Sequence, residues 1–520
     1  MKRPRIDVNL GELDQLLDQA QQAPLSEPDC HKIKTTLHTL VELLTARRST
    51  EKTSAVVGAA GSDAAGSDAA AAEPPDSAKK KANGHGRAPA SAYVGATKVP
   101  VAHPNLKPGD ACPECPKGKV YAQKEPRPLV RIVGQAPLAA TVYTLEQLRC
   151  NACGQVYTAP EPEGVGPEKY DETAMAMIAE LKYGSGMPFN RIENLEKRLG
   201  IPLATATQWE IVEEAAVLLR PVHDELIRQA AQGELFHNDD TSVRILNMER
   251  PEGDERTGVF TSAVVSVVRE ARPEGTTDRR MALYFSGREH AGENLGKVLK
   301  RRAAEMGPAI QMSDALSRNV PKLDAGVELL VANCMAHGRR QFVEVAGNFP
   351  VECRYVLETL GDVYAHDAVT KERKMTPLER LEFHRQHSQP LMEALERWMQ
   401  EQFSGRKVEP NSGLGKSITY MQRHWKALTL FLQQPGAPLD NNICERALKL
   451  AVLHRKNALF YRTMNGAQVG DLFMSLIHTC QLNGVNSFEY LVALMRHAAQ
   501  VAASPREWMP WCYRATLDPG

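Results

Sequence analysis

Three acidic side chains, Asp239, Asp314 and Glu445, stand at positions where they could bind divalent metal ions together. Carboxylate oxygens are hard ligands, which suit Mg²⁺ or Mn²⁺ better than zinc. Two such ions about 4 Å apart can clamp the attacking and the leaving oxygen of an in-line displacement at phosphorus. We expect Asp239 to bridge both ions, and Asp314 and Glu445 each to complete one coordination shell. The predicted chemistry is therefore metal-dependent phosphoryl transfer.

The choice of these three among 63 acidic residues depends on the elements predicted to position them. Strands are predicted over residues 235–246, 258–268, 279–286, 309–313 and 327–332, with a helix over 289–306. Asp239 lies inside the first strand and Asp314 directly follows the fourth, and ligands of open α/β sheets gather at the carboxyl ends of strands. Glu445 lies in the first turn of a helix predicted over 443–453, which the polar run 438–442 would cap. The order of the strands is that of an RNase H-like α/β sheet, the fold class predicted for the core.

Asp239 has an acidic neighbour, Asp240, and strand alternation lets only one of the two face the site. Odd positions of this strand carry apolar side chains and even positions polar ones. The odd set is Leu235, Val243 and Ile245, and the even set is Asn238, Ser242 and Arg244. The odd face is therefore predicted to be packed and to present Asp239, with Asp240 as the alternative ligand.

Four of the ten cysteines form two Cys-x-x-Cys pairs, which are Cys112 with Cys115 and Cys150 with Cys153. A two-residue gap lets both thiolates bind one ion from a tight turn, and two such pairs complete a tetrahedral zinc site. We predict a zinc-ribbon-like module over residues 106–160, with strands near 129–133 and 141–148; two unrelated pairs of reduced cysteines are the alternative. Four thiolates leave no open coordination position, so this zinc is expected to be structural.

Residues 165–232 are predicted to be helical. An amphipathic helix over 187–199 is followed by Gly200, and a second helix begins near residue 202. Helix, glycine-bearing turn and helix is the outline of a helix-turn-helix. In that interpretation Thr205 and Gln208 lie on the first turns of the recognition helix and contact DNA. A helix pair that serves only for packing has the same spacing.

The first hundred residues contain two different patterns. Apolar residues recur at steps of three and four over 8–20 and 31–46, which is typical of helices. Residues 1–50 are therefore predicted to form either a short coiled coil for self-association or a helical hairpin. Residues 51–105 are rich in Ala, Gly, Ser and Lys and are predicted to be a disordered linker.

Composition narrows the class of protein. Ten cysteines in 520 residues are too few and too scattered for a disulfide scaffold. No apolar run approaches the roughly 18 residues of a membrane span, and the basic N-terminus lacks the apolar stretch of a signal peptide. We therefore expect a cytoplasmic, nucleoid-associated protein of several domains. Because 63 basic residues balance 63 acidic ones, any nucleic-acid binding must come from local patches.

One basic patch directly follows Glu445. Between 446 and 462 the sequence contains no acidic residue and five basic ones, which are Arg446, Lys449, Arg455, Lys456 and Arg462. Such side chains neutralise phosphates and position a strand without reading bases. An ordinary solvated helix face is the alternative. Arg339 and Arg340 are further candidates for phosphate binding.

Cys334 and His337 have a spacing found in zinc sites, but the sequence alone names no third ligand nearby. The preferred interpretation is a packed cysteine and a histidine at the edge of the site. His337 could then hydrogen-bond the scissile phosphate.

Four segments together carry a resemblance to a known family. They are His-Asn-Asp-Asp-Thr at 237–241, Asn-Cys-Met-Ala-His-Gly-Arg-Arg-Gln-Phe at 333–342, Leu-Asp-Asn-Asn-Ile-Cys-Glu-Arg-Ala at 439–447 and Arg-Lys-Asn at 455–457. The sequence resembles the DDE transposases of the insertion sequence sixty-six family, from about Cys112 to Trp511. The resemblance implies an RNase H-like core and places the three catalytic acids at Asp239, Asp314 and Glu445.

The same resemblance implies cleavage at element ends and joining to target DNA. The expected partners are DNA at the terminal inverted repeats and at the target, further copies of the chain, and small accessory proteins of the same element. The expected order is a first part of the core over 233–345, a helical insertion over 346–436, a core helix over 437–470 and a C-terminal helical segment over 471–520. Two other functions fit the sequence: a DNA-binding regulator without catalysis, and a structure-selective nuclease on the same fold.

Overall fold

We describe the fold from a computed structural model. It describes residue 91, residues 98–166 with gaps at 115–116, 124–128, 131, 133, 152 and 154, and residues 168–518 with gaps at 250–252, 254, 273–274 and 324–327. The predicted coiled coil and nearly all of the predicted linker lie outside the described residues. The chain divides into two compact units. The larger comprises Met1–Ala64, Leu145–Leu195 and Pro202–Gly520, and the smaller Ala65–Thr144 and Glu196–Ile201.

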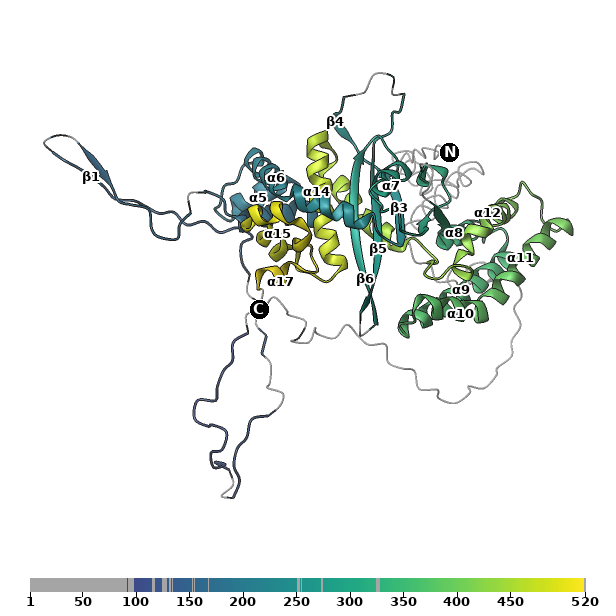
Figure 1. Cartoon of the computed structure of the whole chain (residues 1–520), viewed down its shortest axis with the longest axis horizontal. Coiled ribbons are helices and arrows are strands. Elements are labelled where there is room, and N and C mark those ends of the chain that lie inside the picture. The colour runs from purple at the N-terminus through teal and green to yellow at the C-terminus, as the bar shows by residue number, and fades with distance from the viewer. Residues whose placement is uncertain are drawn as a thin grey trace, which may run out of the picture. The chain divides into compact units, whose positions relative to one another are not determined.

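A mixed β-sheet forms the centre of the larger unit (Figure 1). Among the described residues it has five strands in the order β6-β5-β3-β7-β8. The strands are β3 (Leu235–Ser242), β5 (Phe260–Arg272), β6 (Gly275–Gly287), β7 (Ala309–Ser313) and β8 (Leu329–Asn333). β5 is antiparallel to β3 and β6, whereas β3, β7 and β8 run parallel to one another. The carboxyl ends of these three parallel strands therefore meet at one edge of the sheet.

The predicted strands are confirmed with one correction. The strand expected over 235–246 ends at Ser242, and a separate β4 (Ile245–Asn247) pairs in parallel with β9 (Tyr461–Thr463). The Tyr461 N–H donates to the carbonyl of Arg244 at 2.8 Å, which draws the chain away from the main sheet. The helix expected over 289–306 is shorter, since α7 covers Ala291–Leu299.

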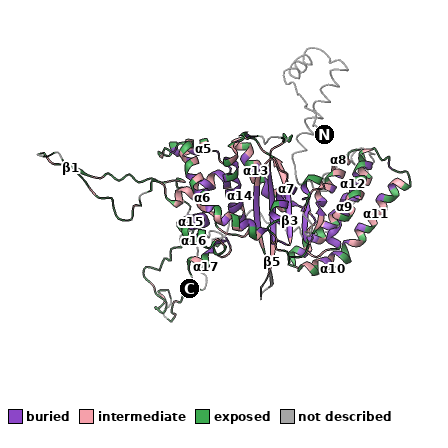
Figure 2. Ribbon diagram, turned by 45° about the horizontal axis from the view of Figure 1, so that its top comes forward, coloured by how far each residue is buried: buried purple, intermediate pink, exposed green. Residues whose placement is uncertain are grey.

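Helices cover both faces of the sheet, whose strands are buried at their centres (Figure 2). α13 (Asn442–Ala458) packs on β3 and β5, and α14 (Met464–Leu482) packs on β6. The Tyr284 hydroxyl donates to the carbonyl of Ala447 at 2.8 Å and fixes α13 to β6. α7 packs against β3 and β5. Because successive side chains of β3 alternate in direction, His237 contacts the start of α13 while Asp240 contacts the start of α7.

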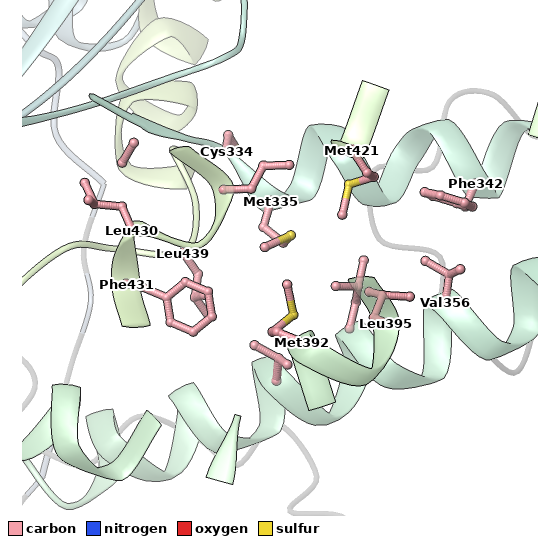
Figure 3. Close-up of a cluster of buried hydrophobic side chains, with 14 of the residues drawn as sticks. Cys334, Met335, Phe342, Val356, Met392, Leu395, Met421, Leu430, Phe431 and Leu439 are labelled. Carbon is pink, nitrogen blue, oxygen red and sulfur yellow. The ribbon is translucent and has the colours of Figure 1, made fainter. Parts of the chain in front are cut away.

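The segment predicted as a helical insertion is built of helices that share one apolar core. They are α9 (Pro350–Glu372), α10 (Pro377–His387), α11 (Gln389–Ser404) and α12 (Gly413–Leu428), packed with α8 (Met335–Val345) of the preceding segment. Figure 3 shows Met335, Met392 and Met421 close together in this core, with Phe342 farther along α8. The core reaches Leu439, so the helices are packed onto the chain that leads to α13.

The remaining α-helices come from two segments far apart in the sequence, residues 172–230 and 487–517. They are α4 (Glu172–Ala179) with a π-helical turn (Glu180–Gly184), α5 (Phe189–Arg198), α6 (Thr205–Ala230), α15 (Ser487–Arg496), α16 (Ala498–Ala503) and α17 (Tyr513–Leu517). α6 contacts α4, α14, α15 and α16, which joins segments far apart in the sequence. No helix in the described part of the chain is long and apolar enough to cross a bilayer.

Candidate active site

Asp239 and Asp314 come together at the carboxyl edge of the sheet through a shared amide. The Asn319 Nδ2 donates to Oδ1 of Asp314 at 2.6 Å and to Oδ1 of Asp239 at 3.3 Å. Asn319 belongs to a 3₁₀ turn (Ser317–Asn319) that follows Asp314. Its own carbonyl accepts from the side-chain amides of Asn238 and Gln311, at 2.7 Å each. The amide that joins the two carboxylates is therefore fixed by the strands that carry them.

Asp240 is turned away from this pair. Its side chain is 1% exposed and contacts His290 Nδ1 at 2.8 Å, the backbone N–H of Ala291 at 3.3 Å and Arg318 at 3.6 Å. Packing of one face does not separate the two aspartates as predicted, since both faces of β3 are buried from Leu235 to Asn238. What separates the two aspartates is the partner on each face: Asp314 and Asn319 for Asp239, and α7 for Asp240.

Glu445 is brought to the same edge by the residue that precedes α13. Asn441 donates from Nδ2 to the carbonyl of Asn238 at 3.2 Å, and its Oδ1 lies 3.0 Å from Nδ1 of His237. Its backbone N–H points at Sγ of Cys334, 3.3 Å away. Asn441 was predicted to cap the helix, but its side chain makes no cap hydrogen bond because it is used in these contacts with β3. Glu445 lies in the first turn of α13, as predicted.

The Glu445 carboxylate lies beside Cys334 and His337. One ligand atom from each of the three residues lies within 4.8 Å of the other two. Cys334 directly follows β8, and its N–H donates to the carbonyl of Ser313 at 2.9 Å. Since Ser313 precedes Asp314, this backbone bond places the Cys334 group next to the aspartate pair. The three predicted acids are therefore carried to one edge of the sheet.

The electrostatics of the aspartate pair fit a divalent cation. Burial, together with the charges of Asp314 and Asp240, raises the pKa of Asp239 to about 7. The hydrogen bonds to the two carboxylates come from neutral amides: the side chain of Asn319 and the N–H groups of Asp240 and Leu316. A half-buried carboxylate pair held by neutral donors gains from a cation between its oxygens, and such oxygen donors suit Mg²⁺.

Asn319 offers a test of this geometry. We expect Asn319→Ala to lower divalent-metal affinity, or any metal-dependent activity, by about 10–100-fold, the effect of losing a residue that orients metal ligands. Ser317→Ala, an exposed position in the same turn, is the matched control and should leave both unchanged. Isothermal titration with Mg²⁺ or Mn²⁺ measures the affinity. Equal affinity in the two variants would show that Asn319 does not orient the carboxylates.

Some of the predicted phosphate-binding side chains are exposed, and one is already hydrogen-bonded within the protein. Arg446, Lys449 and Lys456 are exposed on α13, and Lys449 and Lys456 follow Glu445 by four and eleven residues, which places them on its side of the helix. Arg455 is half-buried, and its Nη1 donates to the hydroxyls of Thr241 and Ser242 at 3.0 and 2.9 Å, so it binds the end of β3.

The second predicted basic group lies on α8 and also contains one exposed and one half-buried side chain. Arg340 is exposed there, and Arg339 is half-buried. Arg340 is thus open to a phosphate on this helix.

The predicted helix-turn-helix has the expected outline, with Gly200 at a φ of +82° between α5 and α6. Gln208, however, is fully buried and donates to the carbonyls of Phe189 and Leu203 at 3.2 and 3.0 Å. The predicted DNA contact of Gln208 is therefore corrected to a packing role. Thr205 is half-buried and lines a groove of about 780 Å³ with Trp209 and Arg462.

Of the predicted zinc ligands that the structure describes, Cys150 and Cys153 belong to the larger unit and Cys112 to the smaller one. Cys150 and Cys153 fall between β1 (Gln147–Arg149) and β2 (Val156–Thr158), which pair antiparallel, and the Cys150 N–H donates to the carbonyl of Gln155 at 2.9 Å. Cys112 follows a β-bridge between Ala111 and Lys119. Cys115 lies outside the described residues. The zinc module therefore stays a prediction, with its strands at 147–149 and 156–158 rather than over 141–148, and none among the described residues of 129–133.

The sequence interpretation missed two residues that organise the site, Asn319 and Asn441. Asn441 stands in the polar run before α13 and was assigned only to capping. Asn319 stands five residues after Asp314 with no pattern around it, and no local signal would have found it.

Comparison with known proteins gives one family and several relatives. The family model described as "Transposase IS66 family" matches residues 168–469. Similar proteins of Sinorhizobium fredii (strain NBRC 101917 / NGR234) include the uncharacterized protein y4hP, 28% identical over 383 residues, which are 70% of this chain and 66% of y4hP. The uncharacterized protein y4jD is 25% identical over 379 residues, 70% of this chain and 71% of y4jD. The chain thus spans about two thirds of the length of these relatives.

Proposed function

We propose that this chain, which belongs to the IS66 family of transposases, cuts DNA at the ends of a mobile element and joins them to target DNA. The reaction would be metal-dependent phosphoryl transfer at a DDE centre formed by Asp239, Asp314 and Glu445. One observation carries the proposal above all: Asp239 and Asp314, 75 positions apart, share the Asn319 amide where parallel strands end.

The sheet supports an RNase H-like core. Along the chain, three strands of this sheet precede α7 and two parallel strands follow it, which agrees with the chain order of strands expected for that fold. In open α/β sheets ligands bind beyond the carboxyl ends of parallel strands. Here Asp239 lies near the end of β3, Asp314 follows β7 and Cys334 follows β8. This edge is where we place the scissile phosphate.

Each residue of the centre would have a distinct task. Asp239, Asp314 and Glu445 would hold Mg²⁺ or Mn²⁺, which when bound supplies charge stabilisation for the attacking and leaving oxygens. The exposed Lys449 and Lys456 would neutralise and position backbone phosphates along α13 without reading the base sequence. The DNA ends and target, an oligomer that pairs two ends, small accessory proteins and a structural zinc in the 106–160 module belong to the same proposal.

The test incubates purified full-length protein with Mg²⁺ and DNA carrying the element's terminal repeats. Asp314→Asn, which keeps the size of the side chain, is the inactive variant, and Ser317→Ala is the control. Nicking or joining at the ends by the parent and the control alone supports the proposal. Equal cleavage by Asp314→Asn contradicts the assignment of Asp314. Specific binding without cleavage by any form favours the regulator function, and cleavage of branched DNA without regard to the ends favours the nuclease.

A further inference from the structure

We propose that Cys334, His337 and Glu445 form a site for a thiophilic divalent cation of the zinc class, beside the position of the hard cation between Asp239 and Asp314. The site shares Glu445 with the proposed function, but binding of an ion there does not require that function. In the described part of the chain, these three residues form a group of histidine, cysteine and acidic side chains whose possible ligand atoms lie within 4.8 Å of one another.

The fold brings the three ligands together from two distant segments. Cys334 precedes the first residue of α8 and His337 lies on its first turn, with the His337 N–H donating to the Cys334 carbonyl at 3.2 Å. Glu445 arrives 111 positions later on α13, and the Asn441 contacts fix the start of that helix. A tetrahedral zinc with bonds of about 2.0–2.3 Å holds its ligand atoms roughly 3.5 Å apart. Ligand atoms within 4.8 Å of one another reach this arrangement by small side-chain rotations.

His337 supplies the second observation. Its Nδ1 is buried and has no hydrogen-bond partner among the described residues. A buried polar atom without a partner destabilises the folded protein, so such atoms are rare unless a ligand or ion satisfies them. The imidazole that carries this unpartnered nitrogen also belongs to the group with the Cys334 thiol and the Glu445 carboxylate, which are the surroundings of a metal ligand.

The environment of Cys334 suits a metal-bound thiolate. Its Sγ accepts from the N–H of Asn441 at 3.3 Å, and it sits at the N-terminus of α8, where the helix dipole favours negative charge. Figure 3 places Cys334 at the end of the apolar core, next to Met335. Burial raises the pKa of the Cys334 thiol to about 11. Coordination to a metal ion deprotonates such a thiol.

The donor set selects the kind of ion. A thiolate and an imidazole favour zinc and similar ions, whereas the oxygens of Asp239 and Asp314 favour Mg²⁺ or Mn²⁺. Three protein ligands leave a fourth position for water or a substrate oxygen, as in zinc sites that take part in chemistry. The same edge of the sheet would thus offer one soft and one hard cation position, and the soft one would fix the orientation of Glu445.

The experiment measures metal content without DNA. Full-length protein is stripped with a chelator, reloaded with Zn²⁺, dialysed and analysed for zinc per chain. We expect Cys334→Ser to lose about one ion per chain relative to the parent. Cys353→Ser, a buried cysteine of the same apolar core, is the matched control and should retain the parental content. Any zinc in the 106–160 module is present in all these forms and cancels in the comparison.

Loading with Co²⁺ gives a second readout, because a cobalt–thiolate bond produces a charge-transfer absorption. The difference spectrum between parent and Cys334→Ser should show one such band. If Cys334→Ser does not fold, His337→Asn decides, since this side chain is only half-buried and its loss should also remove about one ion. Parental zinc content in folded Cys334→Ser or His337→Asn overturns the proposal.

The two proposals fail in different ways. Cleavage of element ends by the parent, with no ion lost from the cysteine variant, would sink the soft site alone. Loss of the ion without any cleavage would sink the proposed function alone.

Discussion

Asp239→Asn is expected to lower the rate of metal-dependent DNA cleavage by at least about 10³-fold. The substitution removes one of the carboxylates that would hold the metal, and metal coordination supplies several kcal/mol of transition-state stabilisation, where each 1.4 kcal/mol is about tenfold in rate. Folding should not suffer, because burial and neighbouring charges raise the pKa of Asp239 and so disfavour its ionised form in the folded protein. Single-turnover cleavage of end-bearing DNA in Mg²⁺, with circular dichroism as the folding control, measures both.

Asp240→Asn is the matched control for this prediction, since the two residues are adjacent on β3. The Asp240 side chain contacts His290 and Arg318 rather than Asp314. Its loss should weaken packing against α7 and leave the cleavage rate within about tenfold of the parent. A reversal, with Asp240→Asn inactive and Asp239→Asn active, would show that Asp240 is the metal ligand and that β3 presents its other face to the substrate.

The elements that carry the acids could be predicted because their signals are local. The run of Val264, Val265, Val267 and Val268 makes β5 a strand whatever surrounds it. Asp314 could be selected because it directly follows a short apolar run that could only be a buried strand. Glu445 could be placed in a first helical turn because polar residues precede it and the apolar spacing then begins.

The contacts that assemble the site could not be predicted, because they depend on residues far apart in the sequence. Asn319 works only because Asn238 and Gln311, on adjacent strands, hold its carbonyl. Cys334 and His337 had a metal-site spacing, but their third ligand lies on a helix whose position depends on the bonds of Asn441 to β3. Gln208 stands at the start of a helix, where an exposed polar residue is common, and only the fold shows that carbonyls of Phe189 and Leu203 enclose it.

The helical insertion is tied to the active-site edge by a buried ionic network. Asp367 on α9 is 2% exposed and accepts from Arg380 of α10 at 2.7 and 3.0 Å and from Lys371 at 2.6 Å. Arg380 also donates to the carbonyl of Ala437 at 2.6 Å, in the segment that leads to Asn441 and Glu445. The stability of the insertion and the position of α13 therefore depend on the same guanidinium.

Asp367→Asn is expected to destabilise this region by about 3–5 kcal/mol at neutral pH, since it leaves Arg380 buried without its counter-charge. Asp362→Asn, at an exposed position of the same helix, is the matched control and should change stability by less than about 0.5 kcal/mol. Hydrogen exchange of peptides from α9 and α10, read by mass spectrometry, reports the local free energy of opening. Equal protection in the two variants would mean that the network adds no stability.

The stability that Asp367 contributes is expected to fall in acid. Burial alone would raise the pKa of Asp367, but the hydrogen bond from His384 and the charges of Arg380 and Lys371 outweigh it, so the pKa lies well below its ordinary value. The unfolded chain therefore binds a proton that the folded protein does not, in the range below the ordinary aspartate pKa of about 3.9. The stability that Asp367 contributes is fully present above that range and is lost as the pH falls through it. The difference between parent and Asp367→Asn should accordingly be constant from pH 8 to pH 6 and shrink below about pH 4; a difference that grew in acid would mean that Asp367 is protonated in the folded protein.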